Sequence, residues 1–190
     1  MADDGEAKHE SKHVPKHVVL VGMMGAGKST VGRKVAAGLA RPFLDSDSVI
    51  EQRVGRSIRE IFEQDGEPEF RKLEANVFAE LLESTVPSVI AAGGGAVLDE
   101  GTRLALSRSA IVVWLRASLE LLSTRLTQSR ENDHRPLLDV ADDNAQDVQM
   151  VLAELSAQRS PIYQEVADHV IDVGHKGSSH TVKSILEALA

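Results

Sequence analysis

A glycine-rich segment near the amino terminus carries the residue types that phosphate binding requires. It runs from Gly22 to Thr30, reads GMMGAGKST, and has the spacing G-x4-GKS. Glycines let the backbone curl so that consecutive N–H groups point at phosphate oxygens, and a following helix adds its positive end. Lys28 can reach the β- and γ-phosphates of a nucleotide, and the Ser29 hydroxyl can hold Mg²⁺. We therefore predict a nucleotide phosphate loop; a glycine turn that binds nothing is disfavoured, because an apolar run precedes the segment and a helical pattern follows it.

Two carboxylates follow the second predicted strand, in the sequence Asp45-Ser46-Asp47. The carboxyl ends of strands face the ligand crevice of an α/β sheet, so one carboxylate can serve a metal and the other a substrate hydroxyl. The alternative is that Asp47 only caps a helix starting near Val49.

Arginines and glycines further along the chain could bind an anionic substrate. Arg71 lies one turn before Glu74 on a predicted helix, where the pair is either a surface ion pair or an oriented clamp for a carboxylate. Gly93-Gly94-Gly95 follows a buried strand and either forms a turn or lets a ligand approach the backbone; we favour the second. Arg159 precedes Pro161 in a helical stretch, and by itself it could be a solvated helix residue.

A long polar segment, Thr127 to Asn144, interrupts the regular pattern between two predicted helices. Connections of this length are typically disordered or act as lids. Its Arg135-Pro136-Leu137-Leu138 stretch combines a charge with an apolar anchor, so Arg135 could close over phosphates and stabilise the charge in transfer.

The elements that must position these residues alternate between strands and helices. Apolar runs predict strands at His17–Val21, Pro42–Leu44, Ser88–Ala92, Ile111–Leu115 and His169–Val173. Helical spacing predicts helices at Ser29–Ala40, Glu67–Glu83, Asp99–Ser107, Leu119–Thr127, Asp147–Ala167 and Ser179–Leu189. This alternation predicts an α/β fold with a central parallel sheet of about five strands and helices on both faces.

Composition limits the function classes. Aromatic residues make up 3% of the 190 residues and the net charge is −8, so nucleic-acid binding is disfavoured. There are no cysteines, which excludes disulfides and thiolate metal sites and fits a cytoplasmic protein. No apolar run approaches the length of a membrane span. Residues 1–16 are polar and are expected to form a flexible tail, although His9, His13 and His17 could in principle bind a metal; residues 17–190 are expected to form one domain.

The motifs together resemble those of shikimate kinases, a P-loop family similar to nucleoside-monophosphate kinases. The matching pieces keep the family's order over most of the chain: Gly22–Thr30, Leu44–Asp47, Ser57–Phe62, Gly66–Arg71, Gly93–Gly95, Arg135–Leu138, and Arg159 with Pro161 and Tyr163. The resemblance implies a monomeric three-layer kinase that uses ATP and Mg²⁺ to phosphorylate the 3-hydroxyl of shikimate, a step towards aromatic amino acids.

The resemblance also implies roles for individual residues. Asp45 would lie near Mg²⁺ with Ser29, and Asp47 would bind shikimate hydroxyls and accept or position the attacking one. Arg71 and Arg159 would hold the shikimate carboxylate, with Gly93, Gly94 and Gly95 beside it. ATP would contact Met24, Gly25, Ala26, Gly27, Lys28, Ser29, Thr30, Arg135 and, on the adenine side, Lys176. The family often has a further lid arginine, for which Arg125 and Arg130 both qualify.

Other functions remain as alternatives at this point. A kinase for another small polyol acid, such as gluconate, would share the phosphate loop and the lid. A GTP-dependent switch would need an Asn-Lys-x-Asp motif, which the sequence lacks. An inactive relative is disfavoured because every expected polar residue is present.

Overall fold

The sheet at the centre of the protein confirms the predicted α/β fold. The computed structural model describes residues 16–129, 145–174 and 177–190. Its five strands are β1 (His17–Val21), β2 (Phe43–Asp45), β3 (Val89–Ala91), β4 (Ala110–Ala117) and β5 (His169–Val173). They are all parallel, in the order β2-β3-β1-β4-β5. Val19 on the central strand lies opposite Ile90 and Val112, so the middle of the sheet is built from the predicted apolar runs.

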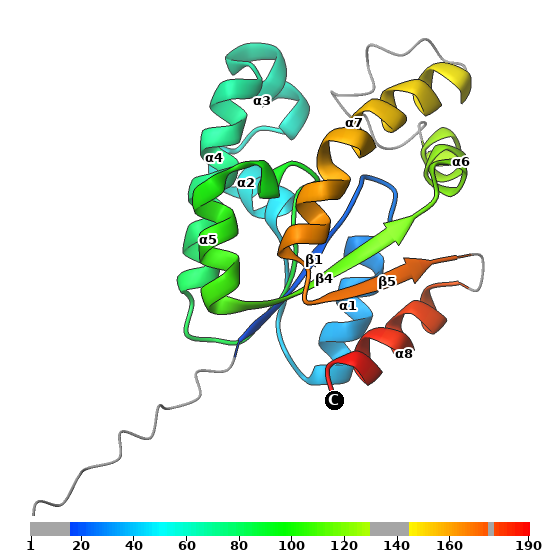
Figure 1. Ribbon diagram of the computed structural model, residues 1–190. Helices are drawn as coiled ribbons and strands as arrows, with labels where there is room; N and C mark the ends of the chain where they lie inside the picture. Colours follow the sequence, from blue (N-terminus) through cyan, green and yellow to red (C-terminus); the bar gives the residue numbers. More distant parts are fainter. Residues whose placement is uncertain (1–15, 130–144, 175–176) are drawn as a thin grey trace, which may run out of the picture.

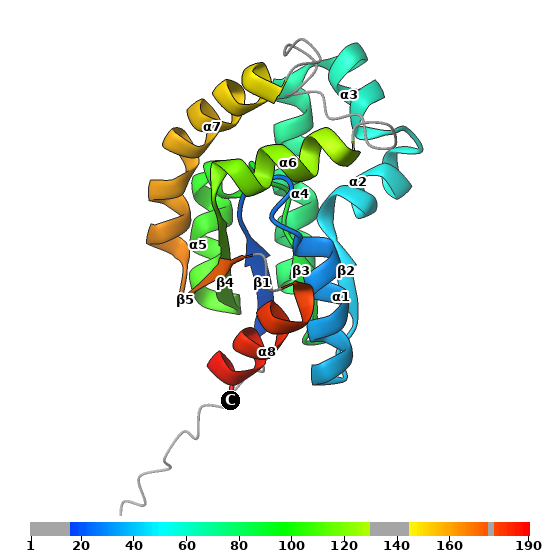
Figure 2. The same ribbon diagram turned by 90° about the vertical axis from the view of Figure 1, so that its right-hand side faces the viewer.

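Helices cover both faces of this sheet. Along the chain they are α1 (Lys28–Leu39), α2 (Ser46–Val54), α3 (Ile58–Asp65), α4 (Glu67–Glu83), α5 (Glu100–Ser109), α6 (Leu119–Ser129), α7 (Ala145–Val166) and α8 (Ser178–Ala188), with a short 3₁₀ helix η1 (Ala96–Leu98). Helices α1 and α8 pack together on one face, and α4, α5 and part of α7 lie on the other (Figures 1 and 2). Helices α3 and α6 lie beyond the sheet, at the end where the strands point (Figures 1 and 2).

The close approach of α1 to the sheet depends on a glycine. A Cβ atom at Gly32 would lie 2.5 Å from the Phe43 ring and 3.2 Å from Leu20. Real Cβ atoms essentially never approach another atom as closely as this Cβ would approach the Phe43 ring, so glycine lets α1 lie against β1 and β2 without displacing that ring. This contact fixes the amino terminus of α1, and therefore the glycine-rich segment, at the carboxyl end of β1.

Two helices between β2 and α4 were absent from the predicted set. Helix α2 begins at Ser46, directly after the strand, so Asp47 lies in its first turn and does not cap it. The cap is Asp45, whose Oδ1 accepts from the Ser48 N–H at 3.5 Å. The interpretation of Asp47 as a cap for a helix near Val49 is therefore wrong.

The segment predicted as a lid from Thr127 overlaps α6, which continues through Ser129. The remainder of that segment, 130–144, lies outside the described residues, as do residues 1–15 of the predicted tail. None of the helices in the described ranges is long and apolar enough to cross a membrane.

Candidate active site

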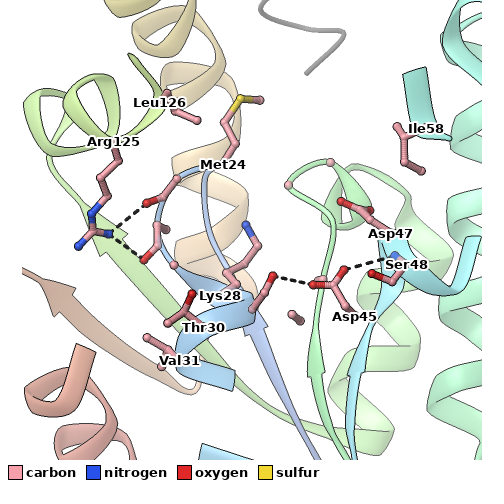
Figure 3. Close-up of a pocket in the computed structure, with 18 of the residues that line it drawn as sticks. Met24, Lys28, Thr30, Val31, Asp45, Asp47, Ser48, Ile58, Arg125 and Leu126 are labelled. Carbon is pink, nitrogen blue, oxygen red and sulfur yellow. Dashed lines mark hydrogen bonds between the residues drawn. The ribbon is translucent and has the colours of Figure 1, made fainter. Parts of the chain in front are cut away.

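Most of the predicted site residues converge on one cavity of about 660 Å³ at the carboxyl ends of the strands, although Gly93 does not line it (Figure 3). The residues that line it include all of the glycine-rich segment from Met24 to Thr30. Its lining also includes Asp45, Asp47, Arg71, Gly94, Gly95, Arg125 and Arg159. Residues from both halves of the chain therefore meet at one site.

The glycine-rich segment has the backbone of a phosphate loop. Gly22, Gly25 and Gly27 have φ angles of 138°, 78° and 93°, values that other residues rarely adopt. The Lys28 Nζ donates to the carbonyl oxygens of Gly22 at 2.8 Å and Met23 at 3.1 Å. Figure 3 shows the ammonium group in the space between the loop and Asp47. A cation is thus held where the phosphate chain of a nucleotide would lie.

The predicted metal ligands lie side by side. The Ser29 Oγ donates to the Asp45 Oδ2 at 2.6 Å (Figure 3). A hydroxyl and a carboxylate are the hard oxygen ligands that Mg²⁺ prefers. Among the described residues no group of three or more His, Cys, Asp or Glu side chains could hold a metal alone. The pair therefore fits Mg²⁺ that takes its other ligands from phosphates and water.

Arg71 is held in one orientation by two carboxylates, as its interpretation as a clamp requires. Its Nη1 donates to Glu74 Oε2 at 2.6 Å, and its Nη2 donates to Glu67 Oε1 at 2.8 Å. Glu74 is only 2% exposed, so the alternative of a surface ion pair is wrong. Burial raises the pKa of the Glu74 carboxyl above its ordinary value, and the neighbouring Arg71 opposes that rise. The two carboxylates hold the guanidinium at the edge of the cavity.

Arg159 reaches the same cavity from α7. Its side chain is buried at 2% exposure, so it is not a solvated helix residue. Its Nε has no hydrogen-bond partner in the part of the chain that the structure describes. A buried guanidinium with an unused donor is suited to an anionic ligand.

The glycine triplet brings these groups together. A side chain at Gly93 would collide with Glu74 and Asp47, and one at Gly95 would collide with Arg71. A Cβ at Gly94 would lie 3.3 Å from Arg159 Nη1. The triplet forms a turn, in which the Ala96 N–H donates to the Gly93 carbonyl oxygen at 3.2 Å, and polar side chains lie close to it. The approach of a ligand to its backbone stays a prediction.

Sequence reasoning missed two contacts. The Arg125 Nη1 donates to the carbonyl oxygens of Gly25 at 3.1 Å and Ala26 at 3.4 Å, which ties α6 to the phosphate loop (Figure 3). Tyr163 donates to the Gly94 carbonyl, and its four-residue spacing from Arg159 was the available signal.

Three residues of the predicted set cannot be placed. Arg130, Arg135 and Lys176 lie outside the described residues. Of the two candidates for a further lid arginine, Arg125 is therefore the one that can be placed at the loop.

Comparison with known proteins points to the same family as the residues of this site. The family model described as shikimate kinase matches residues 24–190. Shikimate kinase of Ruegeria pomeroyi is 46% identical over 175 residues, which cover 92% of this chain and 85% of that protein. Shikimate kinase of Caulobacter vibrioides strain NA1000 / CB15N is 44% identical over 174 residues, 92% of this chain and 82% of that protein.

Comparison with solved structures also finds shikimate kinases. Shikimate kinase from Acinetobacter baumannii, in complex with shikimate, superposes with a TM-score of 0.83 at 38% identity and covers 92% of both chains. A gluconokinase from Sinorhizobium meliloti has a TM-score of 0.57 at 21% identity, over 93% of this chain and 92% of that one, and so shares the fold. From the family match, the relatives and the geometry of the site, this chain belongs to the shikimate kinase family.

Proposed function

We propose that this protein transfers the γ-phosphoryl group of ATP to the 3-hydroxyl of shikimate, giving shikimate 3-phosphate and ADP. The observation that carries the proposal is the convergence of Arg71, Arg159 and Asp47 on one cavity beside the phosphate loop. Shikimate has one carboxylate and several hydroxyls, so its site needs cationic forks and at least one acceptor. The shikimate complex of the Acinetobacter baumannii enzyme supports the same substrate.

In this proposal each side chain has a separate task. Arg71 and Arg159 hold the carboxylate and so fix the ring in the cavity. Asp47 positions the 3-hydroxyl and accepts its proton as the oxygen bonds to the γ-phosphorus and the bond to ADP breaks. Lys28 stabilises the charge on the transferring group, and most of the catalysis is positioning and charge stabilisation. We further propose that a monomer is the working unit, with every group of the site supplied by one copy of the chain.

The test of the proposed function is a coupled assay of ADP release with purified protein and MgATP. We expect release to depend on shikimate and to be much weaker with gluconate. GTP in place of ATP should support little turnover. Equal turnover with gluconate, or no shikimate-dependent release, would reject shikimate as the substrate.

Activity is expected to require a divalent cation, held through Ser29 with Asp45 nearby. When bound, Mg²⁺ neutralises phosphate charge and orients the phosphate chain. We expect turnover to fall to background after EDTA treatment and to return when Mg²⁺ is added. Full activity in EDTA would contradict this assignment.

Arg71→Lys should raise the KM for shikimate by about 10–100-fold and leave the KM for ATP nearly unchanged, because lysine lacks the planar fork that pairs with a carboxylate. Lysine is preferable to alanine here, since the buried Glu74 would otherwise lose its charged partner. The matched control is Arg53→Lys, an exposed arginine paired with Glu80 on the surface. A similar rise in both KM values would mean that Arg71 does not act on shikimate.

A further inference from the structure

Tyr163 is fully buried, at 0% exposure, and does not line the cavity. It belongs to α7, and its ring packs against Trp114 on β4 with centroids 5.8 Å apart. Its hydroxyl donates to the Gly94 carbonyl oxygen at 2.5 Å, across 69 residues of sequence. The Met23 sulfur lies 4.0 Å from the same hydroxyl, so the single proton is directed to Gly94. Burial raises the pKa of Tyr163 to about 12, and the hydroxyl therefore stays a donor at neutral pH.

This hydrogen bond fixes the orientation of one peptide group. In a trans peptide the C=O of one residue and the N–H of the next point in opposite directions. Because the Gly94 carbonyl points towards Tyr163, behind the cavity wall, the Gly95 N–H points away from it. Gly94 and Gly95 both line the cavity, and Arg71 packs against Gly95. The Gly95 N–H thus points away from Tyr163, and the Arg71 guanidinium is a close neighbour of the same glycine.

The rest of the glycine triplet is held by other groups. The Gly93 N–H donates to Ser46 Oγ at 2.8 Å, and the Gly93 carbonyl accepts from the Ala96 N–H at 3.2 Å. Glycines have no side chains to restrict their backbone angles, so their peptide groups can rotate unless external bonds hold them. For the Gly94–Gly95 peptide the holding group among the described contacts is the Tyr163 hydroxyl.

We propose that Tyr163 is a positioning residue for the acceptor substrate: it holds the Gly94–Gly95 peptide so that the Gly95 N–H donates to an acidic or hydroxylated ligand beside Arg71. Tyr163 itself touches neither substrate. The inference rests on the proposed function, since it assumes that shikimate occupies this part of the cavity. Helix α7 then contributes two residues to the substrate site, because Arg159 and Tyr163 lie on the same helix face and both contact Gly94.

The test is Tyr163→Phe, which removes the hydroxyl and keeps the ring. We expect the KM for shikimate to rise by about tenfold, because the peptide is no longer held and a buried carbonyl loses its donor. The KM for ATP should stay within about twofold, since the hydroxyl meets the phosphate loop in the weak contact to the Met23 sulfur. A merely structural role would shift the melting temperature and leave both KM values alone, and that result would overturn the inference. Arg159 also hydrogen-bonds to this hydroxyl. A raised KM in a variant whose Gly95 amide signal matches that of the natural protein would assign the effect to Arg159 and would likewise overturn the inference.

Trp114→Phe is the matched control, because it disturbs the same buried ring pair and leaves the hydroxyl in place. It should lower the melting temperature without changing the KM for shikimate. An equal rise in that KM for both variants would overturn the proposal, because loss of packing would then explain it.

A second measurement needs no variant. In the natural protein the Gly95 amide signal should shift, and its hydrogen exchange should slow, when shikimate is added without nucleotide. An unchanged Gly95 amide at saturating shikimate would overturn the inference even if Tyr163→Phe failed to fold. A different result would reject the proposed function, namely that the natural protein does not phosphorylate shikimate at all.

Discussion

Lys28→Met is expected to lower kcat by a factor of about 10²–10³ while the protein still folds, because the variant removes a preorganised charge from the phosphate loop. In the structure the Lys28 ammonium lies 2.8 Å from the Gly22 carbonyl oxygen, at the mouth of the loop. Charge that develops on a transferring phosphoryl group needs a cation at this place. Methionine has a similar length and no charge, so the packing of the side-chain stem is largely kept.

The measurement is steady-state kinetics with thermal melting as the check on folding. Lys72→Met is the matched control, since Lys72 is an exposed residue of α4 paired with Glu69. It should keep normal kcat, and both variants should melt within a few degrees of the natural protein. A folded Lys28→Met protein with near-normal turnover would contradict the assignment of the phosphate loop.

The strands and the phosphate loop could be predicted because their signals are local. A strand buried on both faces is a continuous apolar run, and His17–Val21 is buried throughout and has the predicted bounds in the structure. The edge strand His169–Val173 also has the predicted bounds, although it is only partly buried. The loop is defined by residue types at fixed spacing, and its strand–helix context lies within the same stretch. Neither prediction needed information from distant parts of the chain.

The two helices after β2 escaped prediction for a physical reason. Helix α2 has the sequence SDSVIEQRV, in which Ser46 and Ile50 are its buried residues, so it lacks a strong apolar stripe. It also begins without a linker after the strand. Helix α3 did have a local signal, a capping box between Ser57 and Glu60, that the apolar pattern alone did not use.

The environment of Arg159 could not be predicted because it depends on tertiary packing. From sequence spacing alone, a helical arginine could be either a solvated surface residue or a residue that binds a ligand. Packing of α7 at the glycine triplet buries Arg159 and places it beside Gly94, 65 positions away along the chain (159 minus 94). The resemblance to the family implies a role for this residue, and the fold shows its neighbours.

Asp47→Asn is expected to lower kcat by about 10²–10⁴-fold, the range for loss of a general base, with a much smaller change in the KM for ATP. Asp47 lies in the first turn of α2, and its Oδ1 would be 2.7 Å from a Cβ placed on Gly93. It therefore faces the part of the cavity assigned to shikimate. Asparagine keeps the shape and loses the proton acceptor, so the reacting hydroxyl would no longer be activated.

Comparison with Asp45→Asn separates the two neighbouring carboxylates. Asp45 is hydrogen-bonded to Ser29, so its variant should need more Mg²⁺ and should recover activity as Mg²⁺ is raised. Asp47→Asn should not recover at any Mg²⁺ concentration, because the group it lacks acts on the hydroxyl. Asp172→Asn, an exposed carboxylate paired with Arg116 on the surface, should behave like the natural protein. If Mg²⁺ restored Asp47→Asn, or if its kcat were unchanged, Asp47 would not be the group that accepts the proton.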